Sequence, residues 1–254
     1  AEAIGLADIM FGDILQSKLR LINRWVTHSA DRLTVLTHFQ LNKVRKGLKV
    51  LRKIHVIPRG VDTKKFIPSG EKLQKGKPVK FFNIAYIHPV KDQVTLLKAF
   101  KIISEYIDAT LVLIGIDYEN RKIHSLADEL GLSNKVFFEG FIPHDSISRY
   151  YASADILLHT SRYESQAVTV VEAMASGVLV CGTHVGMMAD LSGKCCITAP
   201  VQAPAILAQK IINLLTQPDE QVRLRASALE WVKKHSISWT AQQYMSLYAQ
   251  LLNE

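Results

Sequence analysis

Two glutamates stand out in the segment TSRYESQAVTVVEAMASG, because seven residues separate Glu164 from Glu172 where an apolar strand gives way to a helix. If the intervening residues are helical, eight steps of about 1.5 Å put the two carboxylates roughly 12 Å apart. That is about the reach from the sugar of a nucleotide sugar, across its diphosphate, to the ribose, so one glutamate could bind each end. The alternative is that Glu164 merely supports the helix start and Glu172 is a solvated helix residue.

The residues just after Glu164 add a second feature of an anion site. Ser165, Gln166 and Ala167 fall at the predicted helix N-terminus, where backbone N–H groups lack intrahelical partners. Unpaired donors and the positive end of the helix dipole stabilise an anionic group. The segment therefore predicts a diphosphate cradle between the two carboxylates.

A cation is expected at another strand end. Lys91 lies in AYIHPVKDQ, at the turn from an apolar strand into a helix. Ligands of open parallel sheets bind at the carboxyl ends of the strands, and a lysine there could offset charge on a departing nucleoside diphosphate. A lysine before a helix is otherwise an ordinary solvated residue, so the position alone leaves both interpretations open.

Two glycines follow apolar runs, Gly60 in HVIPRGVDTKKF and Gly140 in VFFEGFIP. A missing Cβ lets the backbone approach a ligand closely. Ordinary turn glycines would give the same pattern, so these two gain meaning only from the residues around them.

A sheet is needed to position these groups. From about Val79 the chain alternates short apolar, β-branched runs with longer amphipathic stretches, which is typical of strand–helix–strand units around a parallel sheet. Strands are predicted at 79–87, 109–116, 135–141, 154–160, 177–183 and 194–198. Helices are predicted at 92–106, 121–130, 146–152 and 166–176, with a helical tail over 203–215, 219–235 and 239–252. The fold class is therefore α/β, with a doubly wound parallel sheet.

The first 60 residues follow a different pattern, being amphipathic and basic, and their segment ADRLTVLT resembles a strand with no partner before it. Because a helix and a single strand cannot bury themselves, we expect the end of a preceding domain here. Arg20 and Arg24 lie near Leu21 and Trp25, so a helix lying on a membrane surface is a competing hypothesis. A charged, solvated helix face is the third.

Composition narrows the partners. The 254 residues, 48% of them hydrophobic, are enough for a substantial core. A net charge of +8 suits an anionic partner, which could be nucleic acid, a membrane surface or a phosphorylated small molecule. Nucleic acid is the least supported, because the chain has no zinc-finger spacing and no RNP-type aromatic motif.

The three cysteines show neither metal-ligand nor disulfide spacing, so we expect small buried residues and no metal site.

Localisation is predicted from what the chain lacks. Its apolar runs are far shorter than the roughly 20 residues of a membrane-spanning helix, and the first ten residues do not read as a secretory signal. We therefore expect a cytoplasmic protein, with peripheral association at the inner membrane face as a hypothesis. The basic stretch 70–80 is predicted to be a solvated loop before the sheet.

Taken in order, these motifs resemble family 4 of the retaining glycosyltransferases over most of the chain. The matching segments are ADRLTVLTHFQLNKV, HVIPRGVDTKKF, IHPVKDQVTLLKAF, LVLIGI, NKVFFEGFIP, YYASADILLHTSRYESQAVTVVEAMASGVLVCGTHVG and SWTAQQYMSLYAQLL. The resemblance implies one half of a GT-B fold, which consists of two facing Rossmann-like domains. Residues 1–60 would be the remnant of an N-terminal acceptor domain, 61–236 the Rossmann-like donor-binding domain, and 237–254 a helix crossing back.

The same resemblance implies roles. Glu164 and Lys91 would be catalytic, touching the donor sugar and the diphosphate, while Glu172 would bind the ribose hydroxyls. The main chain of Gly140, Phe141 and Ile142 would line the base pocket. The implied reaction moves a sugar from a UDP-, GDP- or ADP-linked donor to an acceptor with retention at the anomeric carbon, without a metal or other cofactor. The expected acceptor is a glycan or a lipid-linked sugar.

Four positions depart from the family pattern. Tyr86 stands where many members have an arginine. Arg59, where asparagine is common, is the first candidate to supply the missing cation, and Arg162 and His88 are weaker candidates. Ala167 replaces a frequent glycine, and Gly186 is followed by Met187 instead of a second glycine. Backbone N–H groups can still contact phosphate in both places.

Two other functions stay open at this point. One is a non-catalytic nucleotide-sugar-binding module, favoured by Tyr86 and by the short N-terminal region. The other is an epimerase or a phosphorylase of the same fold.

Overall fold

The computed structural model describes residues 6, 17–50, 53–68, 73–74 and 76–253. The first ten residues, used above to predict localisation, lie outside this set apart from Leu6, and so do residues 70–72 and 75 of the predicted basic loop. For residues 17–20 the structure describes the helical backbone and not the side chains, so Arg20 is not placed.

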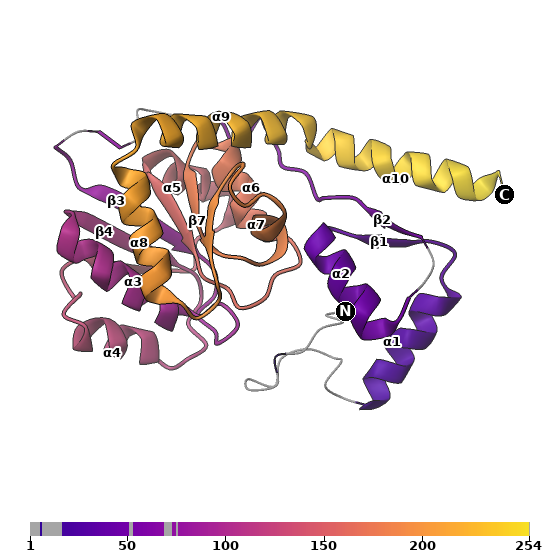
Figure 1. Cartoon of the computed structure of the whole chain (residues 1–254), viewed down its shortest axis with the longest axis horizontal. Helices are drawn as coiled ribbons and strands as arrows, with labels where there is room; N and C mark the ends of the chain where they lie inside the picture. Colours follow the sequence, from indigo (N-terminus) through magenta and orange to yellow (C-terminus); the bar gives the residue numbers. More distant parts are fainter. Residues whose placement is uncertain (1–5, 7–16, 51–52, 69–72, 75, 254) are drawn as a thin grey trace.

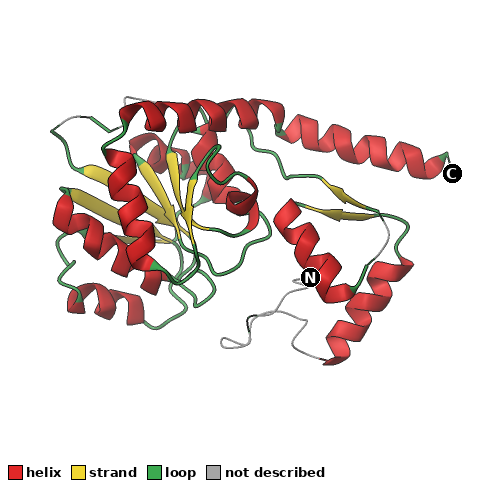
Figure 2. Cartoon of the chain, in the orientation of Figure 1, coloured by secondary structure: helices red, strands yellow, loops and turns green. Residues whose placement is uncertain are grey.

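The elements from β3 to α9 form one unit, which we call the larger unit. At its centre lies a six-stranded parallel sheet with the strand order β5-β4-β3-β6-β7-β8 (Figure 2). Its strands are β3 (Val79–Ile84), β4 (Ala109–Ile114), β5 (Val136–Gly140), β6 (Ile156–His159), β7 (Leu179–Thr183) and β8 (Ile197–Ala199). All six predicted strands exist, and each is shorter than predicted. The order reverses between β3 and β6, which makes this junction the topological switch point of the sheet.

Helices cover both faces of the sheet, and the alternation of strand side chains shows it. Phe81 on β3 belongs to one hydrophobic cluster and its neighbour Phe82 to the other. The first cluster includes residues of α3 (Gln93–Tyr106), α4 (Lys122–Glu129) and α8 (Pro204–Leu215). The second includes residues of α5 (Ser148–Ser153), α6 (Val168–Ala175), α7 (Gly186–Asp190) and α9 (Pro218–Lys234). The α/β, doubly wound prediction is confirmed.

The N-terminal unit comprises α1 (Ser17–Ser29), β1 (Leu33–Val35), α2 (His38–Leu48) and β2 (Ile54–Val56) and lies beside the sheet (Figure 1). The strand that lacked a partner before it pairs in parallel with β2, which follows it in the chain. A small cluster fills the space between these elements: Val35, Leu41, Val44, Leu48, Val50 and Ile54.

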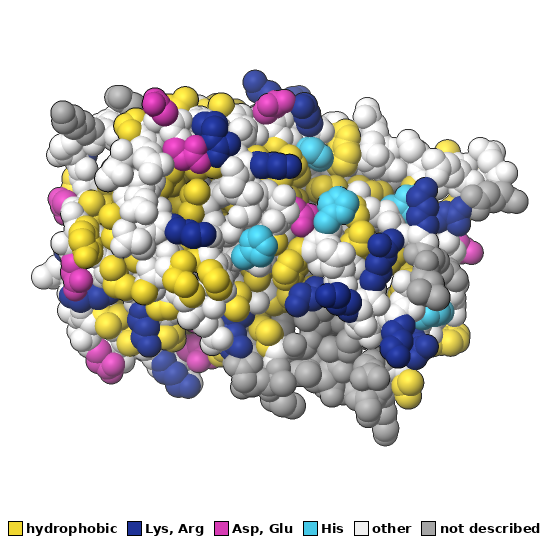
Figure 3. All heavy atoms as spheres, viewed as in Figure 1, with side chains coloured by type: hydrophobic (Ala, Val, Ile, Leu, Met, Phe, Trp, Pro, Cys, Tyr) yellow, Lys and Arg dark blue, Asp and Glu magenta, His cyan; other side chains and the backbone are white. Residues whose placement is uncertain are grey.

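The surface of this unit is basic and in part apolar. Figure 3 shows Lys and Arg side chains gathered on the face of it that is turned toward the viewer. On α1, Leu21, Ile22, Trp25 and Val26 are exposed. Membrane association stays a prediction. Among the described residues, no helix combines the length and the apolar character needed to cross a bilayer.

The helix α10 (Ile237–Leu252) continues from α9 and extends past β1 and β2 (Figure 1). Tyr244 Oη lies 3.5 Å from Thr34 Oγ1 of β1. At the start of α10, Thr240 Oγ1 donates to the carbonyl of Pro58 (2.8 Å) and accepts from Gly60 N–H (2.9 Å). This helix therefore ties the connection after β2 to the end of the chain. The predicted domain limits at 60/61 and 236/237 stay predictions.

Two features differ from the sequence expectations. The helix predicted from Gln166 begins at Val168, because Ala167 has a φ of 68°, which breaks the helical run. Gly60 was expected to make room for a ligand, and that interpretation is wrong: a Cβ there would run into the carbonyl of Ser236. The missing side chain lets the connection after β2 pass the junction of α9 and α10.

We expect Gly60→Ala to destabilise the protein by about 2–3 kcal/mol, because the backbone of Ser236 must move to admit a methyl group. Gly131→Ala is the matched control, since its Cβ meets open space and only its φ of +68° opposes the change, at a cost of roughly 1 kcal/mol. Urea unfolding measures both. Equal losses would contradict the close contact.

Candidate functional site

Lys91 and Glu164, two of the predicted site residues, lie at the switch point of the sheet. Lys91 lies in the turn between β3 and α3, while Glu164 lies in the loop between β6 and α6. Because β3 and β6 are parallel neighbours, their carboxyl ends open on the same edge of the sheet. The two crossovers run to opposite sides there, which leaves a crevice of the kind that binds ligands in open α/β sheets.

A pocket of about 250 Å³ occupies this crevice, and we call it the Lys91 pocket. Its walls include the predicted Ser165, Gln166 and Ala167 next to Glu164, and also Arg59 from the connection after β2. The full lining is Leu36, Arg59, Tyr86, Val90, Lys91, Tyr163, Glu164, Ser165, Gln166, Ala167 and Val168. The structure thus brings Arg59 to the same pocket as Tyr86, as the replacement of the family's arginine suggested.

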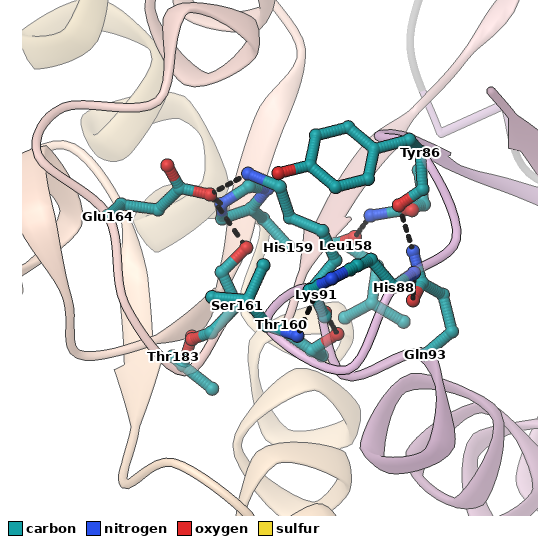
Figure 4. A network of polar contacts seen from close by, with 12 residues as sticks. Tyr86, His88, Lys91, Gln93, Leu158, His159, Thr160, Ser161, Glu164 and Thr183 are labelled. Carbon is teal, nitrogen blue, oxygen red and sulfur yellow. Dashed lines mark hydrogen bonds and ion pairs between the residues drawn. The ribbon is translucent and has the colours of Figure 1, made fainter. Parts of the chain in front are cut away.

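Three side chains converge on a single oxygen of Glu164 (Figure 4). Lys91 Nζ lies 2.6 Å from Oε1 and Ser161 Oγ donates to the same atom at 2.7 Å. His159 Nε2 lies 3.2 Å from Oε1, within ion-pair distance but off the direction of a good hydrogen bond. No described residue bonds the second oxygen, Oε2. One half of the carboxylate is therefore anchored and the other half is available.

The surroundings keep Glu164 ionised. Burial raises the pKa of its carboxyl, but the neighbouring His159 and Lys91 lower it by more, to about 2. The ammonium of Lys91 also lies over the ring of Tyr86, 5.2 Å from its centroid, in a cation–π contact. Tyr86 therefore helps to place the lysine, although it brings no charge of its own.

Glu172 lies apart from this pocket, in the middle of α6. Its Oε1 lies 2.8 Å from His144 Nε2, and its Oε2 accepts from Tyr151 Oη at 2.7 Å. Burial, and then the charge of Glu172, raise the pKa of the Tyr151 phenol. The helical spacing used to relate the two glutamates is wrong, because Glu164 precedes the first residue of α6 by four positions. Glu172 is also not a solvated residue, since only 4% of it is exposed.

The loop after Glu164 is held from two directions. The side chain of Gln166 clasps the Arg59 peptide: Oε1 accepts from its N–H at 2.7 Å and Nε2 donates to its carbonyl at 2.6 Å. On the other side, Thr37 Oγ1 donates to the carbonyl of Ser165 at 2.8 Å. Gln166 therefore positions Arg59, a role that the sequence did not suggest.

The start of α2 is docked on the larger unit by Asp190 of α7. The carboxylate of Asp190 accepts the backbone N–H groups of His38 (2.6 Å) and Phe39 (2.9 Å). An acidic group at a helix N-terminus satisfies free donors and complements the helix dipole. Because Thr37 caps the same helix and binds Ser165, the N-terminal unit and the Glu164 loop are joined at this point.

A second pocket of about 620 Å³ lies at the carboxyl ends of β4 and β5. Gly140 and Phe141 line it, as expected for main chain near a base, and Gly140 has a φ of +65°. The other lining residues are Ile87, Leu113, Gly115, Ile116, Asp117, Asn120, Arg121, His124 and Phe138. Ile142 is not among them; it packs instead against the hydrophobic cluster that includes residues of α5 and α6.

Sequence analysis missed four polar residues around the two glutamates: His159, Ser161, His144 and Tyr151. For His159 a signal existed, because it is the one polar side chain of the strand ILLH. His144 and Tyr151 reach Glu172 from a separate turn and helix, so only the folded chain relates them.

Comparison with known proteins shows the family of the chain. Residues 66–231 match the model of the glycosyl transferases group 1 family. The chain belongs to this family. Among the curated relatives of the chain, the D-inositol 3-phosphate glycosyltransferase of Corynebacterium urealyticum is 28% identical over 91% of the chain and 59% of its own length. The 2-deoxystreptamine glucosyltransferase of Streptomyces kanamyceticus is 25% identical over 83% and 58%. The chain thus spans less than two thirds of these relatives.

Solved structures show the fold. Sucrose-phosphate synthase from Thermosynechococcus elongatus superimposes with a TM-score of 0.83 at 24% identity, over 94% of this chain and 62% of that one. HepE from Anabaena, solved in complex with UDP-glucose, has a TM-score of 0.79 at 19% identity, over 94% and 70%. The likeness confirms that the group 1 chain has the architecture of part of a GT-B fold.

The depressed pKa of Glu164 predicts a pH effect on stability. Because its value of about 2 in the folded protein is below the ordinary 4.5, the ionised carboxylate stabilises the fold above about pH 4.5. This contribution is lost as the pH falls toward 2. Between these values the unfolding free energy of the wild type should fall more steeply than that of Glu164→Gln, by up to about 1.4 kcal/mol per pH unit.

Urea unfolding at several pH values gives both slopes. Glu129→Gln, at an exposed position on α4, is the control and should keep the slope of the wild type. Parallel curves for the wild type and Glu164→Gln would contradict the ion-pair assignment.

Proposed function

We propose that this chain holds the donor site of a glycosyltransferase that transfers a sugar from a nucleoside-diphosphate sugar with retention at the anomeric carbon. The observation that carries the proposal is the buried Lys91–Glu164 pair, which lines a pocket together with the start of α6. A cation, free helix donors and a half-anchored carboxylate suit a diphosphate joined to a polyol.

The residues that line the two pockets are proposed to bind different parts of the donor. The diphosphate lies at the start of α6, where Lys91 and Arg59 offset the charge that develops on the leaving group, without a metal or other cofactor. Glu164 Oε2 accepts a hydrogen bond from a sugar hydroxyl. The base enters the pocket lined by Gly140 and Phe141. Catalysis then depends chiefly on positioning and charge neutralisation.

Glu172 is proposed to bind the ribose hydroxyls. Its two oxygens already contact His144 and Tyr151, and each carboxylate oxygen can accept a further bond. The side chain of His144 is 64% exposed, so it has room to turn aside, although this would break its contacts with Lys65 Nζ and the Phe66 ring. Tyr151 is fully buried and would stay to orient the carboxylate.

The similar proteins support the proposed class of donor, a nucleotide sugar, but they do not point to one class of acceptor. HepE has been solved in complex with UDP-glucose, and also in complex with UDP and glucose. The curated relatives differ in the acceptors that their names state, inositol 3-phosphate and 2-deoxystreptamine. A glycan or a lipid-linked sugar as the acceptor therefore stays a prediction for this protein. Peripheral association with a membrane also stays a prediction.

With the structure considered, a non-catalytic sugar-nucleotide binder is less well supported than it was from the sequence alone. The main argument for it was the loss of a cation at Tyr86, whereas Arg59 lines the same pocket. A binder, an epimerase and a phosphorylase differ from a transferase in their products, so product analysis separates them.

Calorimetric titration with UDP, GDP and ADP tests the donor site. We expect one of these nucleotides to bind, and Lys91→Met and Arg59→Met each to weaken its binding roughly tenfold, because each removes one charge-assisted contact to phosphate. Lys233→Met, an exposed position on α9, should bind as the wild type does. A wild type that binds none of the three would overturn the proposal.

Retention is tested separately, by NMR of the product formed from an α-linked nucleotide sugar. We expect an α-glycoside, and we expect Glu164→Gln to lower the rate at least a hundredfold because the sugar loses its anchored acceptor. A β-linked product would show inversion and would contradict this part of the proposal.

A further inference from the structure

His159 is a buried titratable group that the roles above do not use. It ends β6, a strand paired with β3 on one side and with β7 on the other. Only 2% of the residue is exposed, and neither of its ring nitrogens makes a hydrogen bond of good geometry to a described residue. A buried polar group without a partner costs free energy, so the side chain needs a compensating interaction. The nearest one is Glu164 Oε1, 3.2 Å from Nε2.

We propose that His159 is a positioning residue that holds Glu164 by Oε1, so that Oε2 stays directed at the sugar of the donor. The inference rests on the proposed function and adds to it a residue whose effect is on the sugar and not on the nucleotide.

The need for such an anchor follows from the position of Lys91. In the structure its ammonium bonds Glu164 at 2.6 Å and also lines the pocket proposed for the diphosphate. A lysine is a mobile point charge on a flexible stem, and a bound diphosphate would compete with Glu164 for its N–H groups. Glu164 would then keep only Ser161, a neutral hydroxyl, as a direct donor.

His159 is suited to fill that role because it cannot follow the ligand. Its backbone belongs to the sheet, in register with Gly182 of β7, and its ring is enclosed by protein. Groups on strands hold a site more rigidly than groups on turns. When Lys91 shifts toward phosphate, the imidazole stays within reach of Oε1, and the free oxygen keeps its direction.

The test compares two ligands that differ only in the sugar. Calorimetry measures the binding of a nucleoside diphosphate and of the matching nucleotide sugar to the wild type and to His159→Leu. We expect the variant to bind the nucleotide sugar roughly tenfold more weakly, the effect of one misplaced bond to a charged group. Its affinity for the free diphosphate should stay within twofold of the wild type.

Controls separate positioning from damage to the fold. His55→Leu removes another histidine with a buried, unpartnered nitrogen, on β2 and outside both pockets, and should bind both ligands normally. His159→Gln keeps an N–H donor near the position of Nε2 and should recover part of the loss, and it replaces the leucine variant if that variant fails to fold.

The outcomes are distinct. A wild type that binds no nucleotide sugar overturns the proposed function and this inference with it. A wild type that does bind, together with a folded His159→Leu that loses both ligands equally or neither, overturns the inference alone.

Discussion

The ion pair between Lys91 and Glu164 joins two crossovers that leave the sheet from adjacent strands toward opposite faces. Both partners are mostly buried, with 16% and 12% of their side chains exposed. Removing two charges from water costs several kcal/mol, which the attraction offsets only when further hydrogen bonds satisfy the pair. Ser161 and His159 supply such contacts on the carboxylate side. The rest of the site is arranged around this pair, because it fixes where the loops after β3 and β6 meet.

The loop that carries Glu164 is shaped as much by the N-terminal unit as by the sheet. Thr37 holds Ser165 and Gln166 holds the Arg59 peptide, across more than a hundred residues of sequence in each case. The capping of α2 by Asp190 adds a third link between the same two units. A relative movement of the units would therefore pull directly on the residues that line the Lys91 pocket. The geometry of the Lys91 pocket therefore depends on how the two units pack against each other.

Sequence alone was enough for the sheet, since the alternation of apolar runs and amphipathic stretches depends on local periodicity. It was also enough to group Lys91 with Glu164, because the carboxyl ends of parallel strands share one edge. It failed on the geometry between Glu164 and Glu172, where Ala167 adopts a φ of 68° that an alanine rarely takes. It failed on Gly60 as well, whose close neighbour lies far away in the chain, at the junction of α9 and α10. Such contacts depend on tertiary distances, which hydrophobic periodicity does not encode.

Arg59 and Tyr86 line the Lys91 pocket from different parts of the chain. An arginine at position 86 would be fixed to the larger unit by the end of β3. Arg59 instead stands on the connection after β2, and its peptide is held in place by Gln166. Arg59 thus lines the Lys91 pocket from the segment that links the units. Under the proposed function, neutralising the leaving diphosphate would require that segment to be docked, so the charge that assists the reaction is complete only when the two units are packed as they are here.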